Sequence, residues 1–208
     1  MLLIIDASGS MGLIRYTLID QLNETLQTFR DLQETYASSL NIFVSLVTFN
    51  SNHIKTMMDT VPAADIKLLK YDEYQPDKFS PLYDAMGSSL SRLRHQLYQQ
   101  KKNQVVVTVI SDGLENDSKE YNNKMITNLV RELKSMGWII VYIGANQHLK
   151  VVEDALTIKY QMGFNTDSEE VVRMMRLYRQ SCIRFVEKVS QKLFDDAIDL
   201  QNRFFNSE

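Results

Sequence analysis

Residues 1–12 read MLLIIDASGSMG, and this stretch indicates both a fold and a site. The apolar residues 2–5 are typical of a short strand buried on both faces of a sheet. The run ends at Asp6, and two hydroxyl side chains follow at Ser8 and Ser10. In open α/β sheets ligands bind beyond the carboxyl ends of the strands. We therefore expect these polar side chains to belong to a site rather than to the core.

The rest of the chain alternates between strand patterns and helix patterns. Short β-branched or apolar runs predict strands, and longer segments with apolar residues three and four apart predict helices. This alternation is typical of a doubly wound, Rossmann-like α/β fold, in which helices cover both faces of a mostly parallel sheet. The predicted strands are 2–5, 41–49, 53–58, 104–110, 138–143 and 158–164, and the predicted helices are 13–36, 81–98, 120–136, 148–156 and a final segment from 166.

A second acid follows the strongest predicted strand. Residues 104–110, QVVVTVI, lead into Ser111 and Asp112. Because the carboxyl ends of parallel strands lie at one edge of a sheet, we expect Asp6 and Asp112 to lie at the same edge. Residues 80–84, SPLYD, supply further oxygen atoms at the start of a predicted helix. Carboxylates and hydroxyls suit magnesium, whereas the absence of an adjacent His or Cys disfavours zinc.

Motifs for other chemistries do not fit the same loop. Ser8 stands where a phosphotransferase of the haloacid-dehalogenase type needs a second aspartate. No lysine completes a Walker P-loop, the glycines do not form a dinucleotide fingerprint, and no G-x-S-x-G pentapeptide is present. The histidines, which we expect to be structural and outside the strand ends, are His53, His95 and His148.

Composition and charge argue against several classes of protein. The 208 residues include 23 Lys and Arg against 26 Asp and Glu, a formal net charge of −3 that does not suit nucleic-acid binding. No stretch approaches the roughly 18 apolar residues of a membrane span. The single cysteine, Cys182, allows no internal disulfide and suits a reducing compartment. We therefore expect a soluble, cytoplasmic protein that binds neither nucleic acid nor membrane.

The C-terminal segment is longer than a sheet-covering helix requires. From 166 to 208 no Pro or Gly interrupts an apolar stripe with helical spacing. An ordinary helix has only about 10–14 residues. We expect a C-terminal helical extension over 181–208 that packs back on the domain, grips a partner or mediates self-association. Arg179 and Asp196 interrupt the stripe, which weakens the case for self-association.

Residues 6–10, Asp-Ala-Ser-Gly-Ser, form a D-x-S-x-S motif, and on this motif the chain resembles the von Willebrand factor type A (VWA) domain family. In that family the motif is the first part of the metal-ion-dependent adhesion site. The other two parts occur in order, with a hydroxyl at Ser80 in SPLYDAMG and an aspartate at Asp112 in ISDGLEN. VTFNSN and GWIIVYIGANQ also resemble stand-alone bacterial and phage members. The resemblance covers residues 1 to about 180, which we expect to form the VWA domain.

The resemblance implies a sheet ordered 3-2-1-4-5-6 with strand 3 antiparallel at the edge. It also implies a divalent cation, Mg²⁺ with Mn²⁺ or Ca²⁺ as alternatives, at an open site that accepts an Asp or Glu carboxylate from a protein partner. The implied function is therefore a metal-dependent protein-protein interaction module or adaptor and not an enzyme. The residues that would hold the ion, directly or through water, are Asp6, Ser8, Ser10, Ser80 and Asp112.

One residue of the site departs from the pattern of the family, and one alternative function uses the same ion. Ser80 replaces the threonine usual in the family, so the hydroxyl is kept but the methyl group that helps to fix its rotamer is lost. The alternative function is a metal-dependent phosphoester hydrolase that uses the same ion as a Lewis acid, with Glu115 as the only candidate general base. Asp84 is expected to be a first-turn helix acid rather than a ligand. Glu115 and Asn116 are candidates for the rim of the site, and Asn50 is expected to form a turn.

Overall fold

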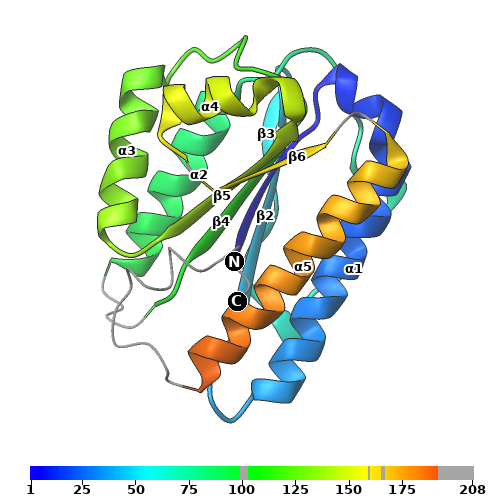
Figure 1. The fold of residues 1–208 in the computed structure, drawn as a ribbon, viewed down its shortest axis with the longest axis vertical. Coiled ribbons are helices and arrows are strands. Elements are labelled where there is room, and N and C mark those ends of the chain that lie inside the picture. Colours follow the sequence, from blue (N-terminus) through cyan, green and yellow to red (C-terminus); the bar gives the residue numbers. More distant parts are fainter. Residues whose placement is uncertain (99–102, 159, 165–166, 192–208) are drawn as a thin grey trace.

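The computed structural model describes residues 1–98, 103–158, 160–164 and 167–191, which form a six-stranded sheet between two layers of helices (Figure 1). The strand order is β3-β2-β1-β4-β5-β6, with β2 and β3 antiparallel and the other neighbours parallel. The predicted order and the antiparallel edge strand are confirmed. The strands are β1 (Leu2–Asp6), β2 (Phe43–Asn50), β3 (His53–Pro62), β4 (Val106–Ser111), β5 (Ile139–Ala145) and β6 (Tyr160–Phe164).

The two faces of the sheet are covered by different helices. Alternate residues of β1 point to opposite faces, so Leu3 and Ile5 pack in the core under α1 and α5, whereas Leu2 and Ile4 pack under α2, α3 and α4 (Figure 1). A central strand buried on both faces explains the uninterrupted apolar run at the start of the chain. The helices are α1 (Arg15–Tyr36), α2 (Leu82–Leu97), α3 (Asn123–Ser135), α4 (Leu149–Leu156) and α5 (Ser168–Ser190).

Helix α1 begins later than the sequence pattern suggested, and strand β3 ends later. A 3-10 helix, η1 (Gly9–Ile14), fills the space between β1 and α1. Strand β3 extends to Pro62, four residues beyond the predicted end. Thr60, near that end, has a left-handed backbone with φ of 54°, and the ladder between β2 and β3 is irregular around Leu46. A β-bulge of this kind breaks the strict alternation by which strands are recognised.

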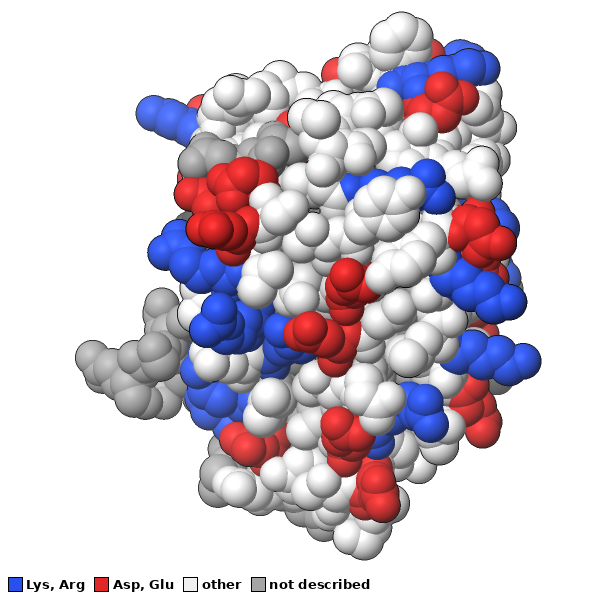
Figure 2. All heavy atoms as spheres, turned by 90° about the vertical axis from the view of Figure 1, so that its right-hand side faces the viewer, with Lys and Arg blue, Asp and Glu red and all other residues white. Residues whose placement is uncertain are grey.

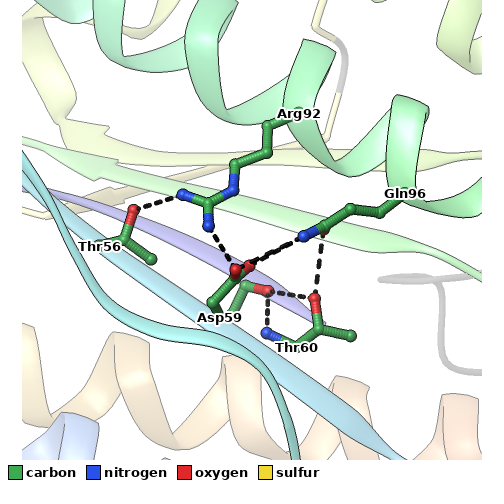
Figure 3. A network of polar contacts seen from close by, with 6 residues as sticks. Thr56, Asp59, Thr60, Arg92 and Gln96 are labelled. Atoms are coloured by element: carbon green, nitrogen blue, oxygen red, sulfur yellow. Dashed lines mark hydrogen bonds and ion pairs between the residues drawn. The ribbon is translucent and has the colours of Figure 1, made fainter.

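Polar contacts join the β3 edge to helix α2 (Figure 3). The Arg92 guanidinium forms an ion pair with Asp59 and donates to Thr56 Oγ1 at 3.1 Å. One turn on, Gln96 Nε2 donates to Asp59 Oδ1 at 3.2 Å, and Thr60 Oγ1 donates to Gln96 Oε1 at 3.3 Å. These contacts hold the irregular end of β3 against α2, whereas Asp6 of β1 lies at the opposite edge of the sheet, near the His53 end of β3.

Helix α5 packs along α1 and continues past the predicted domain boundary near residue 180. Beyond that point Cys182, Phe185 and Val186 are buried in the core. Arg179, which interrupts the apolar stripe, forms a 2.6 Å ion pair with Glu24 of α1. The described part of the predicted extension therefore packs on the domain. Residues 192–208 lie outside the described residues, so their self-association stays a prediction.

The outer surface of the α1 and α5 layer carries charges of both signs. Basic and acidic side chains lie near one another across this face, with uncharged side chains between them (Figure 2).

Among the described residues no helix has the length and apolar character needed to cross a membrane.

Candidate metal centre

The carboxyl ends of the central strands β1 and β4 carry the candidate site. These strands pair in parallel with Ile5 beside Ile110, so Asp6 and Asp112 lie at neighbouring strand ends. Neighbouring strands are only about 4.8 Å apart, which brings the side chains at their ends within reach of a common atom. The expectation that both acids lie at one edge of the sheet agrees with this arrangement.

A chain of hydrogen bonds links all five residues that the sequence singled out. The Asp6 carboxylate accepts from Ser80 Oγ at 2.8 Å and from the Ser8 backbone N–H at 2.7 Å. The Ser8 and Ser10 hydroxyl oxygens are 3.3 Å apart. Ser10 Oγ then donates to Asp112 Oδ1 at 2.7 Å. Three loops thus bring two carboxylates and three hydroxyls to one place.

Backbone hydrogen bonds hold these loops together. The Gly9 N–H donates to the carbonyl of Lys78 at 3.0 Å, and the Asp77 N–H donates to the carbonyl of Ala7 at 2.9 Å. These reciprocal bonds fix the segment before Ser80 against the D-x-S-x-S loop.

The side chain of Asn50 forms the expected turn, because its Oδ1 accepts from the N–H groups of the residues that follow it. Its Nδ2 also donates to the carbonyl of Ala7 at 3.2 Å.

Two residues that contact Asp6 were not predicted as part of the site. Ser111 Oγ donates to Asp6 Oδ2 at 2.5 Å, and Tyr74 Oη donates to the Asp6 backbone carbonyl at 2.5 Å. Ser111 carried a usable signal, since it is a hydroxyl at a strand end directly before Asp112. Tyr74 carried none, because it lies in an irregular polar stretch between β3 and α2 whose path only the folded structure shows.

The Asp84 side chain fixes the loop between β4 and α3. The Asp84 carboxylate accepts from the backbone N–H groups of Lys119, Glu120 and Tyr121 at 2.7–3.0 Å. It is therefore a loop-binding acid in the first turn of α2, as expected.

Both carboxylate oxygens of Glu115 accept hydrogen bonds. Its Oε2 accepts from the Tyr83 N–H at 2.8 Å and from Ser118 Oγ at 2.7 Å. Its Oε1 accepts from the backbone N–H groups of Asp117 and Ser118. The neighbouring Asn116 accepts from the Ser80 N–H at 2.8 Å and so supports the candidate site from the side.

Burial raises the pKa of the two site acids. The pKa of Asp6 lies above its ordinary value because the carboxylate is desolvated, and hydrogen bonds from Ser111, Ser80 and Ser8 offset part of this rise. Desolvation likewise raises the pKa of Asp112, against the opposing effects of the Ser10 hydrogen bond and of His148. Among the described residues, neither acid forms an ion pair with a Lys or Arg.

His148 belongs to the surroundings of the site. It ends a 3-10 helix, η4 (Asn146–His148), that directly follows β5 at the same edge of the sheet. His148 lies three residues beyond the last residue of β5 and so falls outside the strand end as expected, but its charge still acts on Asp112. The sequence pattern placed the end of the strand at 143, whereas β5 continues to Ala145.

The donor set fits a hard divalent cation. It consists of carboxylate and hydroxyl oxygens, the ligands that magnesium and manganese accept. No group of three or more His, Cys, Asp or Glu side chains is placed to hold a metal ion among the described residues, so a cation here would also need the serine hydroxyls beside the two carboxylates. Asp6, Ser8, Ser80 and Asp112 are buried whereas Ser10 is exposed, so the cluster opens to solvent on the Ser10 side.

The fold and the three oxygen-bearing loops define a class of open α/β domains with an adhesion-type metal motif at the carboxyl edge of the sheet. The family model described as "von Willebrand factor type A domain" matches residues 1–176. The chain belongs to the VWA domain family.

Solved structures of VWA proteins share the fold at low sequence identity. The mussel byssus proximal thread matrix protein 1, with a zinc-occupied MIDAS motif, is 18% identical with a TM-score of 0.56, over 88% of this chain and 45% of that one. Manganese-loaded TRAP from Plasmodium vivax is 17% identical with a TM-score of 0.57, over 84% and 70%. The SpRpn10 VWA domain is 15% identical with a TM-score of 0.54, over 88% and 94%.

The present chain therefore spans less than half the length of the mussel protein, and identities at this level show likeness of fold alone. None of the curated protein sequences compared with the chain matches it significantly.

Proposed function

We propose that this chain is a metal-dependent protein-binding module. One divalent cation would be held by Asp6, Ser8, Ser10, Ser80 and Asp112, and would offer a coordination position to an Asp or Glu carboxylate of a partner. The observation that carries the proposal is a hydrogen-bonded network in which Ser8 and Ser10 link the buried carboxylates of Asp6 and Asp112, while Ser80 donates to Asp6 from a separate loop.

Electrostatics support a cation at this place. Burying a carboxylate is costly unless it is paired or coordinates a metal, and here two carboxylates are buried close together. Their raised pKa values express that cost. A bound cation would supply the missing positive charge, and hydroxyl ligands would leave it enough charge to attract an acidic partner.

The identity of the ion is proposed from the ligand chemistry. Oxygen-only donors favour Mg²⁺, with Mn²⁺ or Ca²⁺ as alternatives. The structures of the mussel protein and of TRAP, which share the fold, hold zinc and manganese respectively, and this supports a divalent ion here without identifying it. A cytoplasmic location for this adaptor agrees with the single, buried Cys182, because proteins of a reducing compartment rarely depend on disulfides.

A hydrolase that uses the same ion gains no support from the geometry. Glu115, the candidate general base, accepts four hydrogen bonds that hold its own loop. Both carboxylate oxygens are occupied by these contacts, so Glu115 would have to give some of them up before it could reach a water at the metal. Turnover of generic phosphate esters with Mg²⁺ or Mn²⁺ that is lost in Glu115→Gln would revive the hydrolase.

Affinity capture with and without metal tests the binding module. The tagged chain should retain a partner in Mg²⁺ and release it in EDTA, and Asp112→Ala should capture none. Asp117→Asn, a neutralised acid in the same loop, is the matched control and should behave like wild type. A partner that binds equally well in EDTA and to Asp112→Ala would contradict the proposal.

A further inference from the structure

Large apolar side chains are exposed beside the candidate metal centre. Leu13 is 81% exposed, Tyr16 61%, Phe79 60% and Tyr71 46%. Single exposed apolar residues are common on soluble proteins, but contiguous groups of them mark interaction sites. We call these four residues the apolar rim.

The apolar rim is continuous with the residues of the site. Leu13 follows Ser10 by three residues in η1, and Phe79 directly precedes Ser80. The bond between the Gly9 N–H and the Lys78 carbonyl ties the two segments together across the site. Leu13 and Phe79 thus lie on the two segments that also carry Ser10 and Ser80.

Local contacts hold the rim in place. The Phe79 N–H donates to Ser51 Oγ at 3.1 Å, and the Phe79 carbonyl accepts from the Ser51 N–H at 3.1 Å. Ser51 thus holds both the N–H and the carbonyl of Phe79, so little backbone freedom is lost here when a partner covers the ring.

Two aromatic rings of the apolar rim support each other. Tyr16 and Tyr71 pack edge to face with their centroids 5.2 Å apart. The Arg15 guanidinium lies over the Tyr16 ring at 5.4 Å and also donates to the Tyr71 carbonyl. These contacts keep the rings at the surface rather than letting them fold into the core.

We propose that the partner segment carries a large apolar side chain beside the acidic residue that reaches the metal. The inference rests on the proposed function and adds the chemistry of the partner. The carboxylate supplies charge complementary to the cation, and the neighbouring aliphatic or aromatic side chain packs on Leu13 and Phe79. An acid flanked only by polar residues would leave the rim exposed and would bind more weakly.

Selection from a displayed library of random linear peptides tests this inference. The full chain is the bait in Mg²⁺, and bound peptides are eluted with EDTA. Eluted peptides should contain Asp or Glu with Leu, Ile, Met, Phe, Tyr or Trp enriched at adjacent positions. A synthetic peptide of the selected sequence should bind Phe79→Ser or Leu13→Ser about tenfold or more weakly than wild type.

Matched variants separate the rim from the metal centre. Leu177→Ser removes a comparably exposed side chain from α5 and should bind the peptide like wild type. Phe79→Ser should keep the wild-type affinity for Mg²⁺ alone, because the substituted side chain supplies no ligand.

Each outcome separates the two proposals. Metal-dependent peptides without apolar enrichment, or unchanged binding by both rim variants, would overturn this inference and leave the proposed function standing. Peptides that resist EDTA and bind Asp112→Ala equally, or the recovery of no metal-dependent peptide, would count against the proposed function and this inference together. Sedimentation of wild type, but not Phe79→Ser, with phosphatidylcholine vesicles would instead assign the rim to lipid and overturn the inference.

Discussion

The Ser10 hydroxyl donates a hydrogen bond to Asp112 Oδ1 at 2.7 Å across 102 residues of sequence. This contact joins the loop after β1 to the loop after β4. It completes a connection that begins at Asp6, where Ser80 and Ser111 donate to the same carboxylate oxygen. The two acids are thus held in fixed positions but form no ion pair with a Lys or Arg among the described residues, which is the arrangement a bound cation would stabilise.

The Asp112→Asn variant should separate folding from metal binding. Without metal, the variant should be as stable as wild type or more stable by about 1 kcal/mol at neutral pH, because it removes a buried charge whose pKa is raised. Mg²⁺ should raise the unfolding midpoint of wild type but not that of the variant. Urea unfolding with and without Mg²⁺ measures both effects.

Asp117→Asn is the control for that experiment and should respond to Mg²⁺ like wild type. Stabilisation of Asp112→Asn by Mg²⁺ to the wild-type extent would contradict the assignment of Asp112 as a ligand.

Substitutions at Ser80 test its hydroxyl and the missing methyl group. Ser80→Ala removes the donor to Asp6 and should weaken Mg²⁺ or Mn²⁺ binding about tenfold, which corresponds to one charge-assisted hydrogen bond. Ser80→Thr keeps the hydroxyl and restricts its rotamer, so metal affinity should be equal or higher. Calorimetric titration with Mn²⁺ measures the series. The order would be contradicted if Ala bound metal as well as Ser while Thr bound none.

The pH dependence of stability should reverse when metal is added. The raised pKa values of Asp6 and Asp112 mean that these groups bind protons more tightly in the folded than in the unfolded state. Their stabilising contribution in the metal-free protein is therefore present below the ordinary carboxyl pKa of about 4, and is lost as pH rises through the raised values. Cation binding needs the ionised acids, so stabilisation by Mg²⁺ should grow over the same window.

Thermal unfolding of wild type and of the Asp6→Asn, Asp112→Asn double variant, measured against pH, isolates this contribution from that of other groups. Without metal, the stability of wild type relative to the double variant should fall as pH rises through the raised pKa values. A difference that is independent of pH would contradict the role given to burial.

Local patterns predicted the individual strands and the polar residues at their ends, whereas the order of the sheet came from the resemblance to the VWA family. Apolar runs marked the buried strands, and each run led directly into a polar residue at the carboxyl edge. The contact between Tyr74 and the Asp6 carbonyl depends on the path of an irregular segment, which no periodicity encodes. The continuation of α5 across the boundary predicted near 180 was likewise hidden, because one apolar stripe fits both packing on the domain and self-association.

Thr60 offers a test of the fold that leaves the metal centre untouched. Its φ of 54° costs a β-branched residue roughly 1–2 kcal/mol, which glycine avoids and alanine does not. Thr60→Gly should therefore be about 1 kcal/mol more stable than Thr60→Ala, since both lose the same hydroxyl contacts. Urea unfolding compares the pair, and metal affinity should be the same in both. Equal or greater stability of the alanine variant would contradict the strain assigned to this bulge.

The central claim is that the loops after β1 and β4, together with Ser80, hold one divalent cation. Diffraction from crystals soaked in Mn²⁺, recorded for anomalous scattering, locates such an ion directly. We predict one strong peak at about 2.0–2.3 Å from the hydroxyl oxygens of Ser8 and Ser10, and no peak there in crystals of Asp112→Ala. Absence of the peak from wild-type crystals, or an equal peak in the variant, would contradict the claim.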